Sequence, residues 1–309
     1  MVPRVTLGMP AYNAENYIEI AIDSILAQSF ADFELIITDN ASVDNTEAIC
    51  RRLAQRDSRI RYFRNERNLG AGANYNLGFR LARGEFFKWC AHDDFISKNY
   101  VQLCVEALDR DSGAVLAYGP SQMVNACGDP TQPESATLEG MDNPDAAWRF
   151  LRTVRIGGSD CAIFGVFRRN ALARSLLQQP YYQADRALLA EMSLLGRFIF
   201  VPEITFYNRA HPGRSVTLTD RVARMKWQNA AGNRFALERL PLLRQLFIVA
   251  WRHRQIVAPS RTIPQLTLWA MAPIQLGSYA LELIGLVAPQ LSQRMRNAWN
   301  SRRLARERA

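Results

Sequence analysis

The sequence predicts an α/β fold in which helices cover both faces of a mostly parallel sheet. Short apolar runs alternate along the chain with segments whose apolar residues recur at helical spacing. The connections between them are short, and no internal repeat or low-complexity segment interrupts this order. With 309 residues, the chain is long enough for one large domain or for a core domain with an appendage.

The first elements illustrate the alternation. Residues 5–9 are predicted to form a strand that Pro10 ends, and residues 33–38 form an apolar run typical of a buried parallel strand. A helix is predicted between these strands, and Asn13 or Asn16 could cap it. Its apolar residues have the spacing of one buried helical face: Ile18, Ala21, Ile22, Ile25 and Leu26.

The next elements repeat the pattern. A second helix follows residue 39, and Ser42 or Asp44 could cap it. Residues 60–63 are predicted to form the third strand. A helix that ends at Arg83 and a fourth strand at residues 85–90 come next.

The later elements are less regular. Helices are predicted at residues 98–109, 146–151 and 183–195, and strands at residues 114–118, 161–167, 198–202 and 204–209. Residues 125–143 are polar and contain Pro and Gly, so a loop is predicted there.

Charge and cysteine content limit the classes of function. The net charge is +9, which favours an anionic partner such as a nucleotide, a nucleic acid or an acidic lipid. The basic residues cluster after residue 220 without a recognised nucleic-acid-binding motif, so no nucleic acid partner is expected. Five scattered cysteines without a CxxC pair argue against a disulfide framework and against a zinc site, and a reducing cytosol fits them best. No signal peptide is expected, because a strand-like run begins within the first ten residues.

Two adjacent carboxylates, Asp93 and Asp94, follow the predicted fourth strand. Ligands of open α/β sheets bind at the carboxyl ends of strands, and carboxylates there can hold a divalent cation and, through it, a diphosphate. The alternative is that the pair only starts the next helix. The chain has no GxGxxG after its first strand and no Walker sequence, so neither a dinucleotide site nor a P-loop is expected.

Several segments together resemble the family 2 glycosyltransferases of the GT-A fold. The matching segments are residues 9–13, 24–29, 33–46, 68–78 and 83–85. Asp93-Asp94 falls where that family has its metal-binding DxD-type signature. A looser match runs from Asp185 to Ser215. Each match is weak alone, but the ordered set is highly specific, and it implies a GT-A catalytic domain.

The resemblance implies a nucleotide site after the first two strands. Asp39 corresponds to the carboxylate that hydrogen-bonds the base, and as an acceptor it selects a ring N–H such as that of uracil or thymine. Pro10, Ala11 and Tyr12 resemble the loop that lies against the base and ribose, and Glu15 matches an acidic position near the ribose. Asp39 could instead cap the next turn, and Glu15 could be a solvated residue of a first helical turn.

The resemblance also implies a site for Mg²⁺ or Mn²⁺. Asp93 resembles the second carboxylate of the DxD signature, whereas Ala91 occupies the position of the first. His92 and Asp94 could support the metal ligands or contact the sugar, and His92 could equally be a structural histidine.

Two later segments complete the implied site. Asp185 matches the catalytic base, which the family takes from a Glu-Asp pair and which here follows Ala184. The alternative is an Asp that merely favours the start of its helix. Arg209 and His211 lie in a segment that resembles the family's Tyr-Arg-x-His-x-x-x-Ser pattern and would face the diphosphate or metal. His211 could instead belong to a surface loop.

The implied activity is metal-dependent, inverting transfer of a sugar from a nucleotide-diphosphate donor, with UDP- or dTDP-type donors favoured. The acceptor would be a glycan or a lipid-linked glycan, in the biosynthesis of cell-surface polysaccharide. The acceptor pocket is expected from residues 157–167 and from the loop after Tyr118. The alternative is a non-catalytic member of the same fold that binds sugar nucleotides.

Two regions are expected: a catalytic domain at residues 1–220 and a helical C-terminal extension at residues 221–309. In the extension, arginines flank an apolar segment, residues 274–288, that is shorter than the roughly 20 residues of a membrane-spanning helix. This pattern suits a cytoplasmic protein in peripheral contact with the inner face of the plasma membrane. The alternative is that the segment packs on its own domain or forms a homo-oligomer interface.

Overall fold

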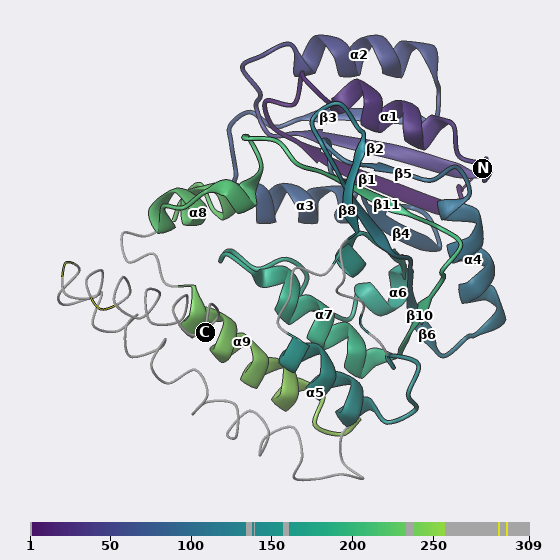
Figure 1. Ribbon diagram of the computed structural model, residues 1–309, viewed down its shortest axis with the longest axis vertical. Coiled ribbons are helices and arrows are strands. Elements are labelled where there is room, and N and C mark those ends of the chain that lie inside the picture. Colours follow the sequence, from purple (N-terminus) through teal and green to yellow (C-terminus); the bar gives the residue numbers. More distant parts are fainter. Residues whose placement is uncertain are drawn as a thin grey trace.

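A seven-stranded sheet lies at the centre of the molecule (Figure 1). The computed structural model describes residues 2–133, 138, 140–156, 161–232 and 238–256, together with 290 and 295. In spatial order, the strands are β10 (Arg197–Phe200), β6 (Ala114–Tyr118), β9 (Val166–Arg168), β4 (Phe86–Trp89), β1 (Val5–Ala11), β2 (Phe33–Asp39) and β3 (Ile60–Arg64). β9 runs antiparallel to its neighbours β4 and β6, and the other pairings are parallel. The prediction of a mostly parallel sheet is confirmed.

Helices cover both faces of this sheet. They are α1 (Ile18–Leu26), α2 (Thr46–Arg56), α3 (Ala71–Arg80), α4 (Tyr100–Arg110), α5 (Ala146–Ile156), α6 (Arg169–Leu172), α7 (Ala184–Leu195), α8 (Arg221–Gln228) and α9 (Arg239–Arg252). α1, α2 and α4 contribute to one apolar core, and α3 and α7 contribute to another. Successive residues of β4 alternate between these cores, with Phe86 in the first and Phe87 in the second. No helix among the described residues has the length and apolar character needed to cross a bilayer.

A second, four-stranded sheet lies beside the first. Its order is β5 (Phe95–Ile96), β11 (Phe206–Arg209), β7 (Ser121–Val124) and β8 (Pro130–Pro133). β11 pairs antiparallel with β5 and parallel with β7. Because β5 follows Asp94 directly, this pairing brings Arg209 to the loop that carries Asp93 and Asp94.

Two predictions about the first elements are wrong. β1 does not end at Pro10 but continues to Ala11, with Pro10 opposite Thr38 of β2. A proline removes one ladder donor without interrupting the extended chain. Neither Asn13 nor Asn16 caps α1, since the N-cap is Tyr17 without a side-chain bond. Asn13 instead has a positive φ of 49° and accepts a hydrogen bond from the backbone of Val43.

Two later predictions are also wrong. The expected strand at residues 161–167 is a short 3₁₀ helix, η1 (Cys161–Phe164), followed after Gly165 by β9. A Cβ on Gly165 would lie 2.6 Å from the carbonyl oxygen of Ala117, so the turn there requires glycine. The expected loop at residues 125–143 contains β8, because a turn around Gly128 returns the chain antiparallel to β7.

A buried carboxylate, Glu34 of β2, joins β1, β3 and the approach to β4. It accepts hydrogen bonds from the Thr6 hydroxyl at 2.8 Å, from Arg61 at 2.8 Å and from Arg83 at 2.7 Å. Burial alone would raise the pKa of Glu34, but the bonds from Arg83, Arg61 and Thr6 outweigh that effect and lower it. The ionised carboxylate therefore stabilises the strands that end at the candidate site.

We expect Glu34→Gln to lower the free energy of unfolding by about 1.5–3 kcal/mol at neutral pH, the usual loss for hydrogen bonds to a charged group. Because the folded-state pKa lies below the ordinary value of 4.5, the stabilisation is present above that pH and is lost as the pH falls through the folded-state pKa. Urea unfolding at several pH values measures the difference.

The control is Glu85→Gln, because Glu85 is more than half exposed and pairs with Arg4 at the surface. That variant should lose less than about 1 kcal/mol. An equal loss in both variants, or a Glu34→Gln loss that does not shrink in acid, would contradict the assignment.

Candidate active site

The carboxyl ends of β1, β2 and β4 meet at one edge of the central sheet. β1 pairs in parallel with both β2 and β4, so the residues that follow these strands are neighbours in space. They include Tyr12, Asp39 and the pair Asp93-Asp94. The structure therefore brings together the predicted nucleotide and metal residues of the N-terminal half.

Asp93 and His211 are in direct contact. The Nε2 atom of His211 lies 3.0 Å from Oδ2 of Asp93, and the two side chains keep 10% and 17% of their surface exposed, so a ligand can still reach them. Burial raises the pKa of Asp93, but the neighbouring His92 and His211 outweigh burial and lower the pKa to about 2. Asp93 is therefore an ionised acceptor at physiological pH.

The second nitrogen of His211 fixes the tautomer. Nδ1 accepts a hydrogen bond from the backbone N–H of Gly213 at 3.2 Å, so in the neutral ring the proton resides on Nε2 and points to Asp93. The ring of Tyr17 packs against the imidazole at a centroid distance of 4.7 Å. His211 is thus a positioned hydrogen-bond donor rather than a residue of a free surface loop.

The Asp93–His211 pair meets part of the ligand requirement of a divalent cation. Two ligands in adjacent positions around an octahedral ion at about 2.1 Å lie about 3 Å apart, as Asp93 Oδ2 and His211 Nε2 do. To bind a cation, Nε2 of His211 would have to lose its proton. The proton would then reside on Nδ1, which could no longer accept the hydrogen bond from Gly213. Within the described residues, no group of three or more His, Cys, Asp or Glu could hold a metal ion. Asp93 therefore fits as a ligand of a cation whose other ligands come from a bound diphosphate and water.

Arg209 is buried beside the Asp93–His211 pair, with 2% of its surface exposed. Its Nε donates to the backbone carbonyl of Asp93 at 2.9 Å and its Nη1 to the carbonyl of Ala126 at 2.8 Å. Its guanidinium lies 5.0 Å from the ring centroid of Tyr17 and 5.2 Å from that of Phe95.

The backbone N–H of Arg209 donates to Oδ1 of Asp94 at 2.8 Å. Asp94 is buried and holds β11 against the loop after β4. Support of a metal ligand or contact with a sugar by Asp94 stays a prediction. Arg209 combines a fixed positive charge with a direct bond to the Asp93 backbone.

Asp39 is fully buried at the end of β2. Its Oδ1 accepts from the backbone N–H of Ser42 at 2.9 Å and from the Ser42 hydroxyl at 2.6 Å, and its Oδ2 accepts from the hydroxyl of Tyr62 at 2.6 Å. These bonds agree with the alternative in which Asp39 caps the turn that follows β2. A contact with a nucleotide base stays a prediction, because a base N–H could reach the carboxylate only after part of its cover moves.

Glu15 joins the loops that follow β1 and β2. Its Oε2 accepts from both the backbone and the side chain of Asn45, at 3.0 and 2.7 Å. The backbone N–H of Glu15 donates in return to Asp44 at 3.1 Å. These bonds cap the start of α2 across the two loops, and contact with a ribose stays a prediction.

Pro10, Ala11 and Tyr12 differ in accessibility. Pro10 and Ala11 are buried within β1, whereas Tyr12 is 41% exposed. The carbonyl of Pro10 lies 3.3 Å from Nδ1 of His92, which connects the end of β1 to the loop of Asp93. Tyr12 is the member of this group that a ligand could contact directly.

Asp185 lies in the first turn of α7 and is half-buried. Burial raises its pKa above the ordinary value, which suits a carboxylate that accepts a proton. Burial is the largest cause that raises the pKa of Tyr75, and the charges of Asp93, Asp94 and Asp185 add to it. Asp93 and Asp185 therefore both lie within electrostatic reach of Tyr75, although 91 residues separate them in the sequence.

Comparison with known proteins identifies the family. The model of glycosyl transferase family 2 matches residues 6–171, which is more than half of the chain. The chain belongs to glycosyl transferase family 2. The predicted family is confirmed.

Two relatives of this family 2 chain are larger proteins. An uncharacterized glycosyltransferase of Rickettsia felis is 35% identical over 127 residues, which cover 41% of this chain and 21% of the relative. A chondroitin synthase of Escherichia coli is 30% identical over 219 residues, which cover 70% of this chain and 30% of the relative. The chain thus spans about a fifth to a third of the length of these two relatives.

Solved structures share the fold. TarS 1-349 of S. aureus in complex with UDP-GlcNAc matches with a TM-score of 0.58 and 18% identity, covering 83% of this chain and 71% of that one. A mannosyltransferase of Pyrobaculum calidifontis in complex with GDP-Man and Mn²⁺ matches with a TM-score of 0.52 and 17% identity, covering 97% and 88%. These likenesses confirm the GT-A fold class.

The sequence did not single out two further residues near the candidate site. Tyr75 lies within the segment 68–78 that carries the resemblance, and a large aromatic residue between two asparagines was the available signal. Lys88 of β4 is fully buried, and burial lowers its pKa. Its amine bonds the carbonyl of Phe164 and lies 4.6 Å from the ring centroid of Tyr100.

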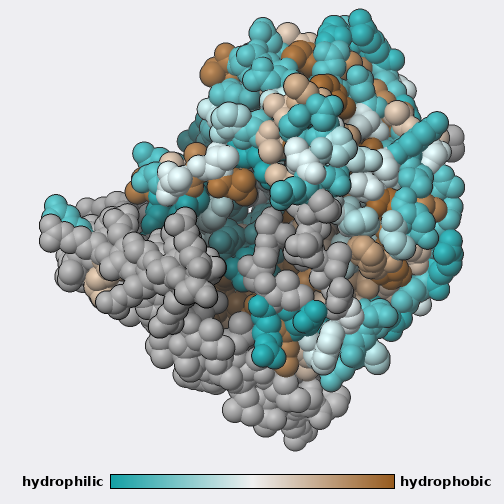
Figure 2. All heavy atoms as spheres, in the orientation of Figure 1, coloured by the Kyte–Doolittle hydropathy of each residue, from teal (hydrophilic) through white to brown (hydrophobic). Residues whose placement is uncertain are grey.

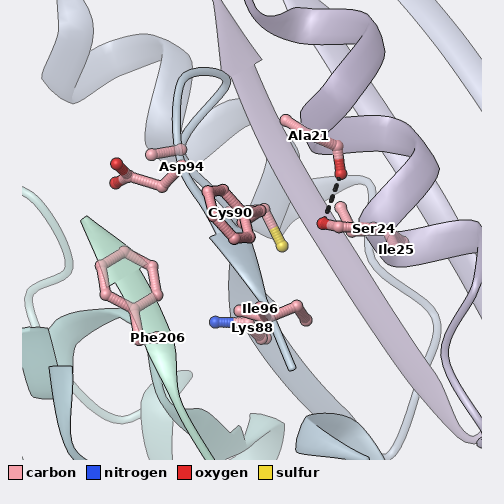
Figure 3. A pocket seen from close by; sticks show the side chains of 10 residues that line it. Ala21, Ser24, Ile25, Lys88, Cys90, Asp94, Ile96 and Phe206 are labelled. Atoms are coloured by element: carbon pink, nitrogen blue, oxygen red, sulfur yellow. Dashed lines mark hydrogen bonds between the residues drawn. The ribbon is translucent and has the colours of Figure 1, made fainter. Parts of the chain in front are cut away.

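Lys88 and Asp94 line a small cleft of about 10 Å³ between α1 and β11 (Figure 3). Its other wall includes Ser24 of α1, and Cys90 and Phe206 lie between them. The cleft adjoins the Asp93–His211 pair but does not contain it. Residues 157–160 of the expected acceptor pocket lie outside the described residues.

Proposed function

We propose that this chain is an inverting glycosyltransferase that transfers a sugar from a nucleotide-diphosphate sugar to a glycan or lipid-linked acceptor. The observation that supports this most directly is the contact between Oδ2 of Asp93 and Nε2 of His211, 3.0 Å apart, at the carboxyl ends of the parallel strands β1, β2 and β4. Asp93 is ionised and suited to hold a cation. Asp185 has a raised pKa and is suited to accept a proton. Direct displacement at a sugar carbon needs these two functions on either side of the reacting atom.

The reaction has two chemical requirements: the acceptor hydroxyl must lose a proton, and the diphosphate must leave with additional negative charge. Asp185 would accept the proton, a contribution typically worth about 10²–10⁴ in rate. The positive charge of Arg209 would stabilise the charge on the diphosphate, and His211, whose Nε2 proton points to Asp93, would hold that carboxylate in place. Mg²⁺ or Mn²⁺ held by Asp93 would supply Lewis acidity to the leaving group. One displacement inverts the anomeric centre, so no protein nucleophile is needed.

For the donor, we favour a uracil or thymine nucleotide. A carboxylate offers about four lone-pair directions, and Ser42 and Tyr62 occupy three of those of Asp39. One remaining direction suffices for the single ring N–H of uracil or thymine. The neighbouring donors on the edge of guanine would need both carboxylate oxygens. Binding of UDP-GlcNAc by the TarS neighbour is consistent with this choice.

For the acceptor, an aromatic pair beside Asp185 supports a sugar. Tyr182, three residues before Asp185, lies 6.5 Å from Trp227 of α8, and the guanidinium of Arg224 lies 5.1 Å from the Tyr182 ring. Trp227 is 37% exposed. Exposed aromatic faces beside a general base can stack on the C–H face of a glycan ring, which fits a role in polysaccharide biosynthesis.

A peripheral contact with the inner face of the plasma membrane is part of the proposal. The apolar segment at residues 274–288 lies outside the described residues, but α9 offers a related surface. Three of its exposed residues recur at helical spacing: Arg244, Ile248 and Trp251. Trp251 is 64% exposed and Arg254 lies over its ring. Trp and Arg together suit an anionic lipid interface. Elsewhere on the face in Figure 2, the described hydrophobic side chains form only small groups among hydrophilic ones.

The first prediction concerns the cation. Asp93→Ala should abolish the extra thermal stabilisation that Mn²⁺ adds to UDP binding, since the ionised oxygen that would hold the ion is gone. Thermal shift with UDP, with and without Mn²⁺, measures it. Asp23→Ala, at an exposed position of α1, is the control and should behave as wild type. A variant at residue 93 that keeps the full Mn²⁺-dependent shift would refute the cation site.

The second prediction concerns proton transfer. Asp185→Asn should keep UDP-sugar binding and lose about 10²–10⁴ in turnover, because an amide cannot accept the proton. In the wild type, the rate should fall in acid as Asp185 becomes protonated, and because its pKa is raised, this fall should lie above the ordinary 3.8. Steady-state rates over a pH range measure both effects.

Asp142→Asn, at an exposed position, is the matched control. Retention of more than about a tenth of the rate by Asp185→Asn would exclude general-base catalysis. A wild-type protein that binds a nucleotide sugar and never consumes it would favour the non-catalytic alternative.

The third prediction concerns the membrane. The full chain should sediment with anionic vesicles at low salt, and the double variant Ile248→Ser/Trp251→Ser should not, because its interfacial side chains are lost. Trp148→Ser, which removes an exposed tryptophan of α5, is the control. Equal sedimentation of all three proteins, or none at all, would refute membrane contact through α9. Sedimentation-velocity analysis of the same proteins would then test a homo-oligomer.

A further inference from the structure

The phenol of Tyr75 has no role in the site as described so far. Tyr75 lies in the middle of α3 and is half-buried. Its backbone carbonyl accepts a hydrogen bond from Nε1 of Trp89 at 3.0 Å, and the centroids of the two rings are 6.3 Å apart. Trp89 is the last residue of β4, four residues before Asp93. These contacts hold Tyr75 against the strand that leads to Asp93.

The neighbouring residue connects α3 to the other side of the site. The side-chain amide of Asn76 donates to the carbonyl of Gln178 at 2.8 Å, and its oxygen accepts from the Gln178 backbone N–H at 3.0 Å. Gln178 lies in the segment that leads into α7 and Asp185. Tyr75 is therefore held between the two elements that carry the carboxylates of the proposed reaction.

Within the described part of the chain, Tyr75 bonds Trp89 through its backbone carbonyl, which leaves the phenol O–H available to a ligand. Burial first, and then Asp93, Asp94 and Asp185, raise its pKa, so it stays protonated at physiological pH. Ionised carboxylates only accept hydrogen bonds, and three of them face this region. The Tyr75 hydroxyl is therefore an uncharged hydrogen-bond donor in a region of negative electrostatic potential.

These properties favour one class of ligand. A neutral group rich in hydroxyls can accept a hydrogen bond from the Tyr75 phenol without bringing further negative charge beside the carboxylates. The reacting sugar carbon must lie between the leaving diphosphate on the Asp93 side and the base Asp185. The only part of a nucleotide sugar that meets both conditions is the sugar itself.

We propose that Tyr75 binds the transferred sugar, with its O–H donating a hydrogen bond to an oxygen of the sugar ring or of a ring substituent. The proposal rests on the proposed function and adds a residue that contacts the sugar but not the nucleotide. Loss of this bond should weaken sugar binding selectively, because Asp93, Asp39 and Arg209 remain in place.

The test is isothermal titration of Tyr75→Phe with UDP, UDP-glucose, UDP-glucuronate and UDP-GlcNAc in the presence of Mn²⁺. The variant should bind UDP as wild type does. It should bind the UDP-sugar that wild type prefers about 3- to 10-fold more weakly, the usual effect of one neutral hydrogen bond. Tyr100→Phe removes a hydroxyl whose ring is fully buried beneath Lys88, and it should change neither affinity.

Each other outcome counts against the proposal in a distinct way. An unchanged affinity of Tyr75→Phe for every UDP-sugar would exclude the contact. An equal loss for UDP and UDP-sugar would assign Tyr75 to the nucleotide or to the fold. A wild type that binds neither UDP nor a UDP-sugar would instead refute the proposed function itself.

Discussion

The guanidinium of Arg209 joins the two sheets at the candidate site, and the geometry of that site depends on it. Its hydrogen bonds reach the Asp93 backbone after β4 and the Ala126 backbone after β7. Its own backbone N–H is bonded to Asp94. A buried cation of this kind is tolerated because hydrogen bonds and the faces of Tyr17 and Phe95 compensate for lost hydration. The consequence is a rigid loop in which Asp93 can meet His211.

The helices after residue 220 are closely packed on the catalytic fold. A Cβ on Gly72 of α3 would lie 2.8 Å from the side-chain nitrogen of Gln228, at the end of α8. Buried Glu191 of α7 accepts from the backbone of Leu176 at 2.7 Å and lies 2.9 Å from Nε2 of His253, at the end of α9. The helix that carries Asp185 is therefore bonded to the C-terminal region. The predicted division at residue 220 stays a prediction, and these contacts show that a cut there would expose the faces of α3 and α7.

Part of the candidate site could be predicted because its position depends only on the order of strands and helices along the chain. Asp93 follows a short apolar run, and the carboxyl ends of parallel strands gather at one edge, so its position follows from the pattern of strands. The hydrogen-bond partners of Asp39 and Glu15 could not be predicted from the sequence. Their carboxylates bond Tyr62 and Asn45, from other loops, and such pairings depend on how strands and loops adjoin in space.

The sequence by itself determined the alternation of strands and helices, the family, and the chemical types at Asp93, Asp185, Arg209 and His211, because periodicity and motif order are properties of neighbouring residues. Only the tertiary structure decided that β9 runs antiparallel, that Pro10 continues β1, and that Tyr75 faces carboxylates from β4 and α7. The physical reason is that strand direction, burial and electrostatic potential arise from residues far apart in the chain. The pKa of Asp93 and that of Asp185 move in opposite directions because His92 and His211 outweigh burial at Asp93, whereas burial outweighs the backbone bonds and the charge of Arg186 at Asp185.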